Sequence, residues 1–214
     1  MKLGIIFDMD GTLWDSSEGV AKAWSEVVIR EYPERGEITT KEIQQVMGLT
    51  MVRIAEILFD KLPEKDRLEL LNHCCEYENE YLLKNGGILY PGLEDTWKKL
   101  QENYHLYIVS NCQKGYIEAF LEHYGFAHYF DDIECYGNND LPKADNIKLL
   151  AERNKLDDAV YVGDIQGDYD AATKAGFHFI HAVYGFGKIT EKVPEISTFS
   201  QLPEVLTQIW PGRN

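Results

Sequence analysis

The sequence predicts an α/β fold with a parallel sheet and one inserted helical segment. Three observations indicate this: short apolar runs rich in β-branched and aromatic residues, helical periodicity between the later runs, and one long interval without a convincing strand. Strands that alternate with helices favour a parallel sheet with helices on both faces. The ligands of such sheets bind beyond the carboxyl ends of the strands.

Each predicted element follows from a local pattern. Runs of Ile, Val, Tyr and Phe bounded by polar residues predict the strands Lys2–Phe7, Leu106–Ser110, Asp132–Tyr136, Ala159–Gly163 and His178–Val183. Between the last four of these runs, apolar residues at helical spacing predict the helices Gly115–Tyr124, Asn146–Asn154 and Tyr169–Ala175.

The interval from residue 17 to residue 86 contains amphipathic runs without a strand signal. Helical spacing occurs in the segments Gly19–Glu31, Lys41–Val46, Val52–Phe59 and Lys65–Lys84. The pair Gly86-Gly87 and the turn Tyr90-Pro91-Gly92 mark the return to the sheet. We therefore expect a core of residues 1–16 and 87–214 and a helical cap of residues 17–86. Because the cap leaves and re-enters the core at one place, we also expect hinge motion over the active face.

Composition excludes several classes of protein. The chain has 214 residues, of which 44% are hydrophobic and 27% charged, as in ordinary globular domains. With 21 Lys and Arg against 36 Asp and Glu, the net charge of −15 argues against nucleic acids and anionic membranes as partners. The first apolar run is too short for a signal peptide or a membrane span. No Cys-x-x-Cys spacing occurs among the cysteines Cys74, Cys75, Cys112 and Cys135. We therefore expect the protein to be located in the reducing cytoplasm.

Acidic residues follow two of the predicted strands. Asp8 and Asp10 are two residues apart on an extended segment and so point the same way, while Gly11 permits a sharp turn. Asp164 ends another predicted strand, and Asp168 follows it. Neighbouring carboxylates repel each other unless a cation or a shared proton relieves the repulsion. Oxygen ligands without His or Cys suit Mg²⁺, which is therefore the expected cofactor.

Polar groups of a different kind follow two other predicted strands. Ser110 and Asn111 come directly after one apolar run, and Lys143 follows a turn after the next. A hydroxyl, an amide and backbone N–H groups can hold phosphate oxygens, and an ammonium offsets the charge of phosphate and of an attacking carboxylate. Together with the acids these residues predict a site of phosphoryl transfer. Spacing alone leaves open whether Asp168 or Asp170 completes it.

These segments resemble the motifs of the haloacid dehalogenase (HAD) superfamily, in particular its phosphoglycolate-phosphatase-like and β-phosphoglucomutase-like branch with a helical cap. The matching segments follow the order of the family: Asp8-Met9-Asp10-Gly11-Thr12, Ser110-Asn111, Pro142-Lys143, and Gly163-Asp164 with Asp168. The resemblance covers essentially the whole chain. It implies a Rossmann-like core with an inserted cap and a phosphatase that acts on a small phosphorylated metabolite.

The resemblance also implies residue roles for catalysis. Asp8 would attack phosphorus and form an aspartyl-phosphate, and Asp10 would act first as general acid and then as general base. Lys143 would be catalytic and would bind the substrate phosphate together with Ser110 and Asn111.

The same resemblance implies a ligand set for Mg²⁺. The carboxylates of Asp8 and Asp164 and the backbone carbonyl of Asp10 would hold the ion, and Asp168 would contact the ion or its waters.

Two alternatives to a phosphatase remain at this point. A sugar phosphomutase would share the paired aspartates and the cap, whereas a signalling module would accept phosphate on Asp8 as a switch without turnover. The cap and the second aspartate count against a switch. In the cap, Arg53 follows a loop that resembles the family's substrate-contacting loop, which gives the hypothesis that it meets an acidic end of the substrate. A monomer and a homodimer are both compatible with the sequence.

Overall fold

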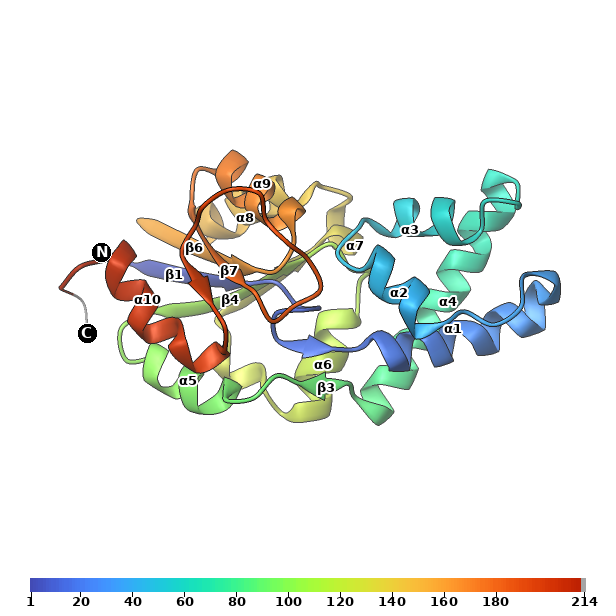
Figure 1. Cartoon of the computed structure of the whole chain (residues 1–214), viewed down its shortest axis with the longest axis horizontal. Coiled ribbons are helices and arrows are strands. Elements are labelled where there is room, and N and C mark those ends of the chain that lie inside the picture. The colour runs from blue at the N-terminus through green and yellow to red at the C-terminus, as the bar shows by residue number, and fades with distance from the viewer. Residues whose placement is uncertain (213–214) are drawn as a thin grey trace.

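The computed structural model describes residues 1–212, which form a six-stranded sheet with helices on both faces (Figure 1). The strand order is β5-β4-β1-β6-β7-β8, and every neighbouring pair is parallel. The strands are β1 (Leu3–Phe7), β4 (His105–Ser110), β5 (Asp132–Cys135), β6 (Asp158–Gly163), β7 (His178–Ala182) and β8 (Glu195–Ile196). The predicted α/β fold is confirmed, and all the strands except β8 lie where the sequence places them.

The central strand β1 explains why two layers of helices are needed. Its residues are buried along the whole strand, with Ile5 and Phe7 in one hydrophobic core and Ile6 in another. A strand covered on both faces is apolar at every position. The helices around the sheet are α5 (Leu93–Leu100), α6 (Tyr116–Tyr124), α7 (Tyr136–Asn139), α8 (Lys143–Arg153), α9 (Gln166–Ala175) and α10 (Leu202–Ile209), with short 3-10 turns η2 (Ala127–Tyr129) and η3 (Phe199–Gln201). Among the described helices, none is both long and apolar enough to cross a lipid bilayer.

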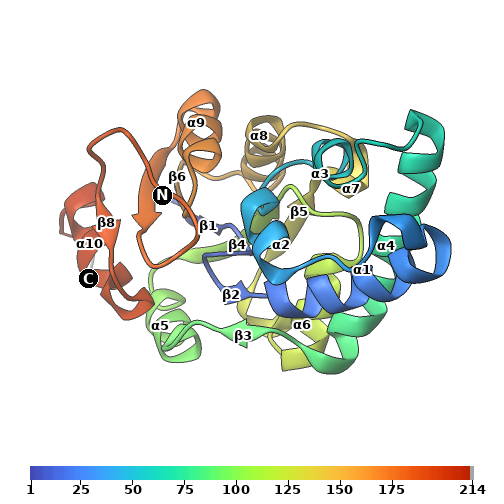
Figure 2. The same cartoon turned by 45° about the vertical axis from the view of Figure 1, so that its right-hand side comes forward.

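The residues of the predicted helical cap fold into helices that gather at one end of the molecule (Figure 2). Helix α1 packs against α4, α2 against α1, and α3 against α4, while α4 also contacts α6 of the core. The elements are α1 (Ser17–Glu31), η1 (Pro33–Arg35), α2 (Thr40–Val46), α3 (Met51–Leu58) and α4 (Glu64–Asn85). The exact division at residues 16 and 87 stays a prediction.

Two short strands lie where the chain leaves the core and where it returns. Strand β2 (Trp14–Asp15) pairs antiparallel with β3 (Ile88–Leu89), so that Trp14 lies opposite Leu89 and Asp15 opposite Ile88. Buried Trp14 also makes edge contacts with the rings of Tyr116 and Phe120 on α6. This pair of strands fixes the entry and the exit of the cap side by side.

Helix α2 of the cap begins in a capping box, in which two side chains and two backbone N–H groups bond reciprocally. The Thr39 hydroxyl accepts the backbone N–H of Glu42 at 3.2 Å, and the Glu42 carboxylate accepts the N–H of Thr39 at 2.8 Å. The Arg35 guanidinium donates to the same carboxylate at 2.5 Å. Although partial burial acts in the opposite direction, the hydrogen bonds from Thr39 and Arg35 hold the pKa of Glu42 at about 2.

Replacing Glu42 with glutamine is expected to lower the free energy of unfolding by about 1 kcal/mol at pH 7. Because the folded-state pKa lies below the ordinary value of 4.5, the contribution of the ionised form is complete above that value and is lost as the pH falls toward 2. Urea unfolding at pH 7 and pH 3 should therefore show a smaller difference at pH 3. Glu64→Gln, an exposed acid in the first turn of α4, is the control. An equal loss at both pH values would contradict the charge argument.

Candidate active site

Three buried carboxylates meet at the carboxyl ends of β1 and β6. Asp8 follows β1, and its backbone N–H donates to the carbonyl of Val162 at 2.9 Å, which continues the pairing of the two strands. One oxygen each of Asp8, Asp164 and Asp168 lies within 4.8 Å of the others. The structure thus brings these predicted site residues together because adjacent parallel strands end at one edge of the sheet.

Lys143 lies in the same cluster, at the first position of α8. Its Nζ donates to Asp8 Oδ1 at 3.0 Å and to Asp168 Oδ1 at 2.6 Å, and all three side chains are buried. Burial disfavours the ammonium, but Asp168 and Asp8 together raise the pKa of Lys143 above its ordinary value. The lysine is therefore charged and bridges two acids that follow different strands.

The single ammonium does not neutralise the three acids. Burial and the charge of Asp168 raise the pKa of Asp8 to about 7, although Lys143 acts in the opposite direction. The same two causes raise the pKa of Asp164 well above its ordinary value, even though the backbone N–H of Phe186 donates to Asp164 Oδ2 at 2.7 Å. A divalent cation with oxygen ligands would relieve this repulsion, so the donor set fits Mg²⁺.

Asp168 has both carboxylate oxygens engaged by the protein. While Oδ1 accepts from Lys143, Oδ2 accepts the backbone N–H groups of Asp164 at 3.0 Å and of Ile165 at 3.2 Å. These bonds tie the start of α9 to the end of β6. Asp170, by contrast, is exposed and accepts from Gln166 at 3.0 Å. The geometry therefore places Asp168, and not Asp170, in the cluster.

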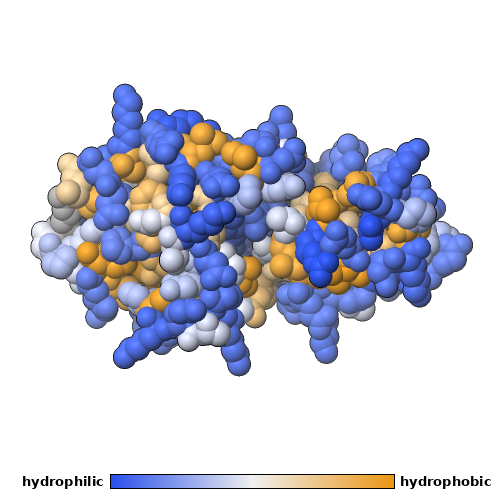
Figure 3. Space-filling model, turned by 90° about the horizontal axis from the view of Figure 1, so that it is seen from above, coloured by the Kyte–Doolittle hydropathy of each residue, from blue (hydrophilic) through white to orange (hydrophobic). Residues whose placement is uncertain are grey.

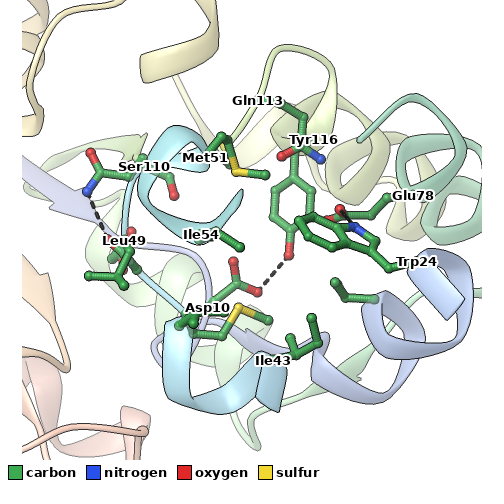
Figure 4. Close-up of a pocket in the computed structure, with 17 residues that line it drawn as sticks. Asp10, Trp24, Ile43, Leu49, Met51, Ile54, Glu78, Ser110, Gln113 and Tyr116 are labelled. Atoms are coloured by element: carbon green, nitrogen blue, oxygen red, sulfur yellow. Dashed lines mark hydrogen bonds between the residues drawn. The ribbon is translucent and has the colours of Figure 1, made fainter. Parts of the chain in front are cut away.

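Asp10 lies beside this cluster but outside it, and Figure 4 shows its carboxylate turned toward the hydroxyl group of Tyr116. Oδ1 accepts from Ser16 at 2.6 Å and from Tyr116 at 2.7 Å, and Tyr116 is also 2.8 Å from Ser16 Oγ. Burial raises the pKa of Asp10 to about 6, while the two hydroxyl groups lower it in part. A carboxyl with a pKa in this range exchanges protons readily near neutral pH.

Sequence reasoning missed the two partners of Asp10. Tyr116 is buried at the start of α6, 106 positions along the chain from Asp10, and Ser16 lies just before the cap. Neither belongs to a motif, and a tyrosine on an amphipathic helix is indistinguishable from a core aromatic residue. Only the folded structure, which brings both residues to Asp10, identifies them.

The predicted phosphate-binding pair ends strand β4. Ser110 is buried and lines a cavity together with Asp8 and Asp10, whereas the Asn111 amide donates to the backbone carbonyl of Gly48 at 2.9 Å. Gly48 belongs to the cap loop between α2 and α3 and has φ +79°; a Cβ there would lie 2.4 Å from the Ile165 side chain. Asn111 therefore connects the core to the cap, and Asn111 Oδ1 is buried without a hydrogen-bond partner among residues 1–212.

The cavity itself lies between the core and the cap, where the molecule narrows when seen from above (Figure 3). It contains about 480 Å³ of space, part of which is open to solvent. Arg53, the cap residue that the sequence suggested for substrate binding, does not line it. Its side chain is 61% exposed and pairs with Glu56 at 2.7 Å.

Comparison with known proteins places this arrangement in a family. The family model for "haloacid dehalogenase-like hydrolase" matches residues 5–182. The chain belongs to the haloacid dehalogenase-like hydrolases. The predicted resemblance is thereby confirmed, and the matched range contains the acids, the lysine and the whole helical cap.

Similarities to curated relatives and to solved structures are consistent with membership in this family. The chain is 28% identical to a phosphoglycolate phosphatase of Escherichia coli O157:H7, with 86% of this chain and 82% of the relative covered, and 30% identical to one of Vibrio cholerae, with 85% and 84% covered. A haloacid dehalogenase-like hydrolase structure from Bacteroides fragilis has a TM-score of 0.81 at 25% identity and covers 94% of this chain and 100% of that one. A β-phosphoglucomutase from Clostridium difficile, at 18% identity and a TM-score of 0.76 with 98% and 99% covered, shares the fold.

Proposed function

We propose that this HAD hydrolase is a Mg²⁺-dependent phosphatase that hydrolyses a small phosphorylated metabolite through an aspartyl-phosphate on Asp8. One observation carries the proposal: at the edge of the cavity, the Asp8 carboxylate is held by the Lys143 ammonium at 3.0 Å, inside a buried cluster of acids. A carboxylate held in this way beside a cavity is placed to act as a nucleophile toward phosphorus.

The reaction would proceed in two displacements. A carboxylate oxygen of Asp8 attacks phosphorus and the bond from phosphorus to the ester oxygen breaks, while the carboxyl group of Asp10 gives its proton to the leaving oxygen. The Asp10 carboxylate then takes a proton from water, which attacks the aspartyl-phosphate. The bond between phosphorus and Asp8 breaks, and phosphate and the original enzyme result.

Charge stabilisation would come from the remaining residues. The carboxylates of Asp8 and Asp164 and the backbone carbonyl of Asp10 would hold Mg²⁺, with Asp168 next to the ion and bonded to Lys143. When bound, the ion offsets the charge of the phosphate and reduces its repulsion of Asp8.

The substrate phosphate would be held by core residues. Ser110 and Asn111, at the end of β4, would hold the phosphate oxygens together with the ammonium of Lys143.

Phosphate release from a panel of phosphate esters tests the proposal. Hydrolysis is expected with Mg²⁺ and is expected to stop in EDTA and to return when Mg²⁺ is added back. Hydrolysis that continues in EDTA would contradict the metal dependence. Isomerised phosphosugar without free phosphate would favour the phosphomutase alternative, and phosphorylation of Asp8 without turnover would favour the signalling alternative.

Replacing Tyr116 with phenylalanine is expected to lower kcat about tenfold with little change in KM. The Tyr116 hydroxyl holds the carboxylate of Asp10 at 2.7 Å, and a hydrogen bond to such a charged group contributes about 1.5–3 kcal/mol. Tyr124→Phe is the control, because Tyr124 lies on the same helix but donates to the carbonyl of Gly87. Steady-state kinetics of both variants test whether Tyr116 positions Asp10. A kcat within twofold of the wild type for Tyr116→Phe would refute this role.

Two further expectations accompany the function. We propose a cytoplasmic location, which is supported by four cysteines that are all buried and free of disulfide bonds. The oligomeric state, a monomer or a homodimer, stays a prediction.

A further inference from the structure

The wall that the cap contributes to the cavity is almost wholly apolar. It consists of Val20, Trp24, Ile43, Val46, Met47, Leu49, Met51 and Ile54, with the glycine at position 48. The exception is Glu78 of helix α4, which Figure 4 shows beside Trp24. Among the described residues that line the cavity there is no lysine, arginine or histidine. On the side of the cap, the organic part of a substrate therefore meets apolar side chains and one carboxyl group.

Glu78 is a buried acid without a cationic partner in the described chain. Its side chain is 3% exposed, and its carboxylate accepts the indole N–H of Trp24 on α1. Burial raises the pKa of Glu78 to about 8, an effect that Trp24 and the Gln113 amide offset only in part. Burying a carboxyl group in this way opposes folding. The proposed reaction does not use this group, so its place in the cavity wall points to contact with the substrate.

The two cations that the sequence suggested for the site are paired with other groups. Arg53 is paired with Glu56 on an exposed face of α3, and the ammonium of Lys143 is shared by Asp8 and Asp168. A second anionic group on the substrate would therefore find no described cation in the lining of the cavity, and on the cap side it would approach Glu78. In a cavity of low polarity, an anion without a cationic partner is costly to bury, and Glu78 offers it no positive charge in either protonation state.

We propose that Glu78 determines substrate specificity by selecting phosphate monoesters whose organic part carries a hydroxyl or ammonium donor and no second anionic group. This inference rests on the proposed phosphatase function and narrows its substrate class. The donor bonds to the Glu78 carboxyl group, and the remaining carbon atoms pack on Trp24 and the aliphatic side chains. Substrates with a carboxylate next to the ester, such as phosphoglycolate, are disfavoured.

Three two-carbon esters of similar shape test this selection in the wild-type enzyme. Phosphoglycolate carries a carboxylate, 2-hydroxyethyl phosphate a hydroxyl, and 2-aminoethyl phosphate an ammonium group. At pH 7 with Mg²⁺, kcat/KM for phosphoglycolate is expected to be at least tenfold below that for the other two. A kcat/KM for phosphoglycolate equal to or above theirs overturns the inference and leaves the phosphatase function standing. No phosphate from any ester, p-nitrophenyl phosphate included, overturns both.

A pair of variants assigns the selection to Glu78. In Glu78→Gln, whose side chain cannot ionise to pair with a bound ammonium group, the ratio of kcat/KM between 2-aminoethyl phosphate and phosphoglycolate is expected to fall at least fivefold. Glu80→Gln, the same change at an exposed position of α4, is expected to keep the wild-type ratio. An unchanged ratio in folded Glu78→Gln, with circular dichroism as the check of folding, overturns the assignment. If this variant does not fold, the wild-type ratios alone decide.

Discussion

Replacing Asp8 with asparagine is expected to lower kcat for phosphate ester hydrolysis by about 10⁴-fold or more, a loss typical of removing a nucleophile. The amide keeps the shape of the side chain but lacks the charged oxygen that, in the proposed reaction, would attack phosphorus. Rapid quenching of the wild-type enzyme should yield acid-stable phosphate bound to residue 8, and the variant should yield none. Phosphate release measured by a coupled assay gives the rate.

Asp170→Asn is the matched control for this experiment, because Asp170 is an exposed aspartate outside the cluster. Its kcat is expected to stay within twofold of the wild type. Substantial turnover by Asp8→Asn, or phosphate trapped on another residue, would show that the nucleophile is not Asp8.

Replacing Lys143 with methionine is expected to affect activity and stability together. The buried acids Asp8 and Asp168 would lose the ammonium that lies 3.0 Å and 2.6 Å from them. Loss of one partner from a buried ion pair costs about 3–5 kcal/mol of folding free energy. We expect kcat/KM to fall by about 10²–10³-fold, because a positive charge next to the transferring phosphate is missing.

Thermal unfolding with and without Mg²⁺ separates the two effects. Because a bound cation would neutralise the same acids, Mg²⁺ is expected to reduce the difference in Tm between wild type and Lys143→Met. Lys148→Met, an exposed lysine on the same helix, is the control and should change neither Tm nor kcat/KM appreciably. A Lys143→Met variant as stable as the wild type without Mg²⁺ would contradict the ion-pair account.

Most of the sheet could be predicted because its strands are buried on both faces. Runs such as Leu3–Phe7 are apolar at every position, and this signal is local. Strands β2, β3 and β8 were not predicted, since each is two residues long and too short to show a period. Their pairing depends on the rest of the chain, as the contact of Trp14 with Leu89 illustrates.

The acidic cluster could be predicted because its residues follow strands that end at one edge. The partners of Asp10 and the role that we propose for Glu78 could not be predicted in this way. On α4, Glu76, Glu78 and Glu80 form one acidic series in sequence, and only tertiary packing buries the middle one. Polar and apolar residues are not clearly separated between the faces of α4, so its sequence does not show which of its acidic residues faces inward.

The pairing of β2 with β3 has a consequence for how this architecture can be diversified. Paired strands lie about 4.8 Å apart, so the two ends of the intervening segment are almost adjacent. A segment with adjacent ends can be exchanged as a cassette with little strain on the remainder of the fold. Transplanting residues 17–86 between related hydrolases would thus redirect selectivity and retain the chemistry of the recipient.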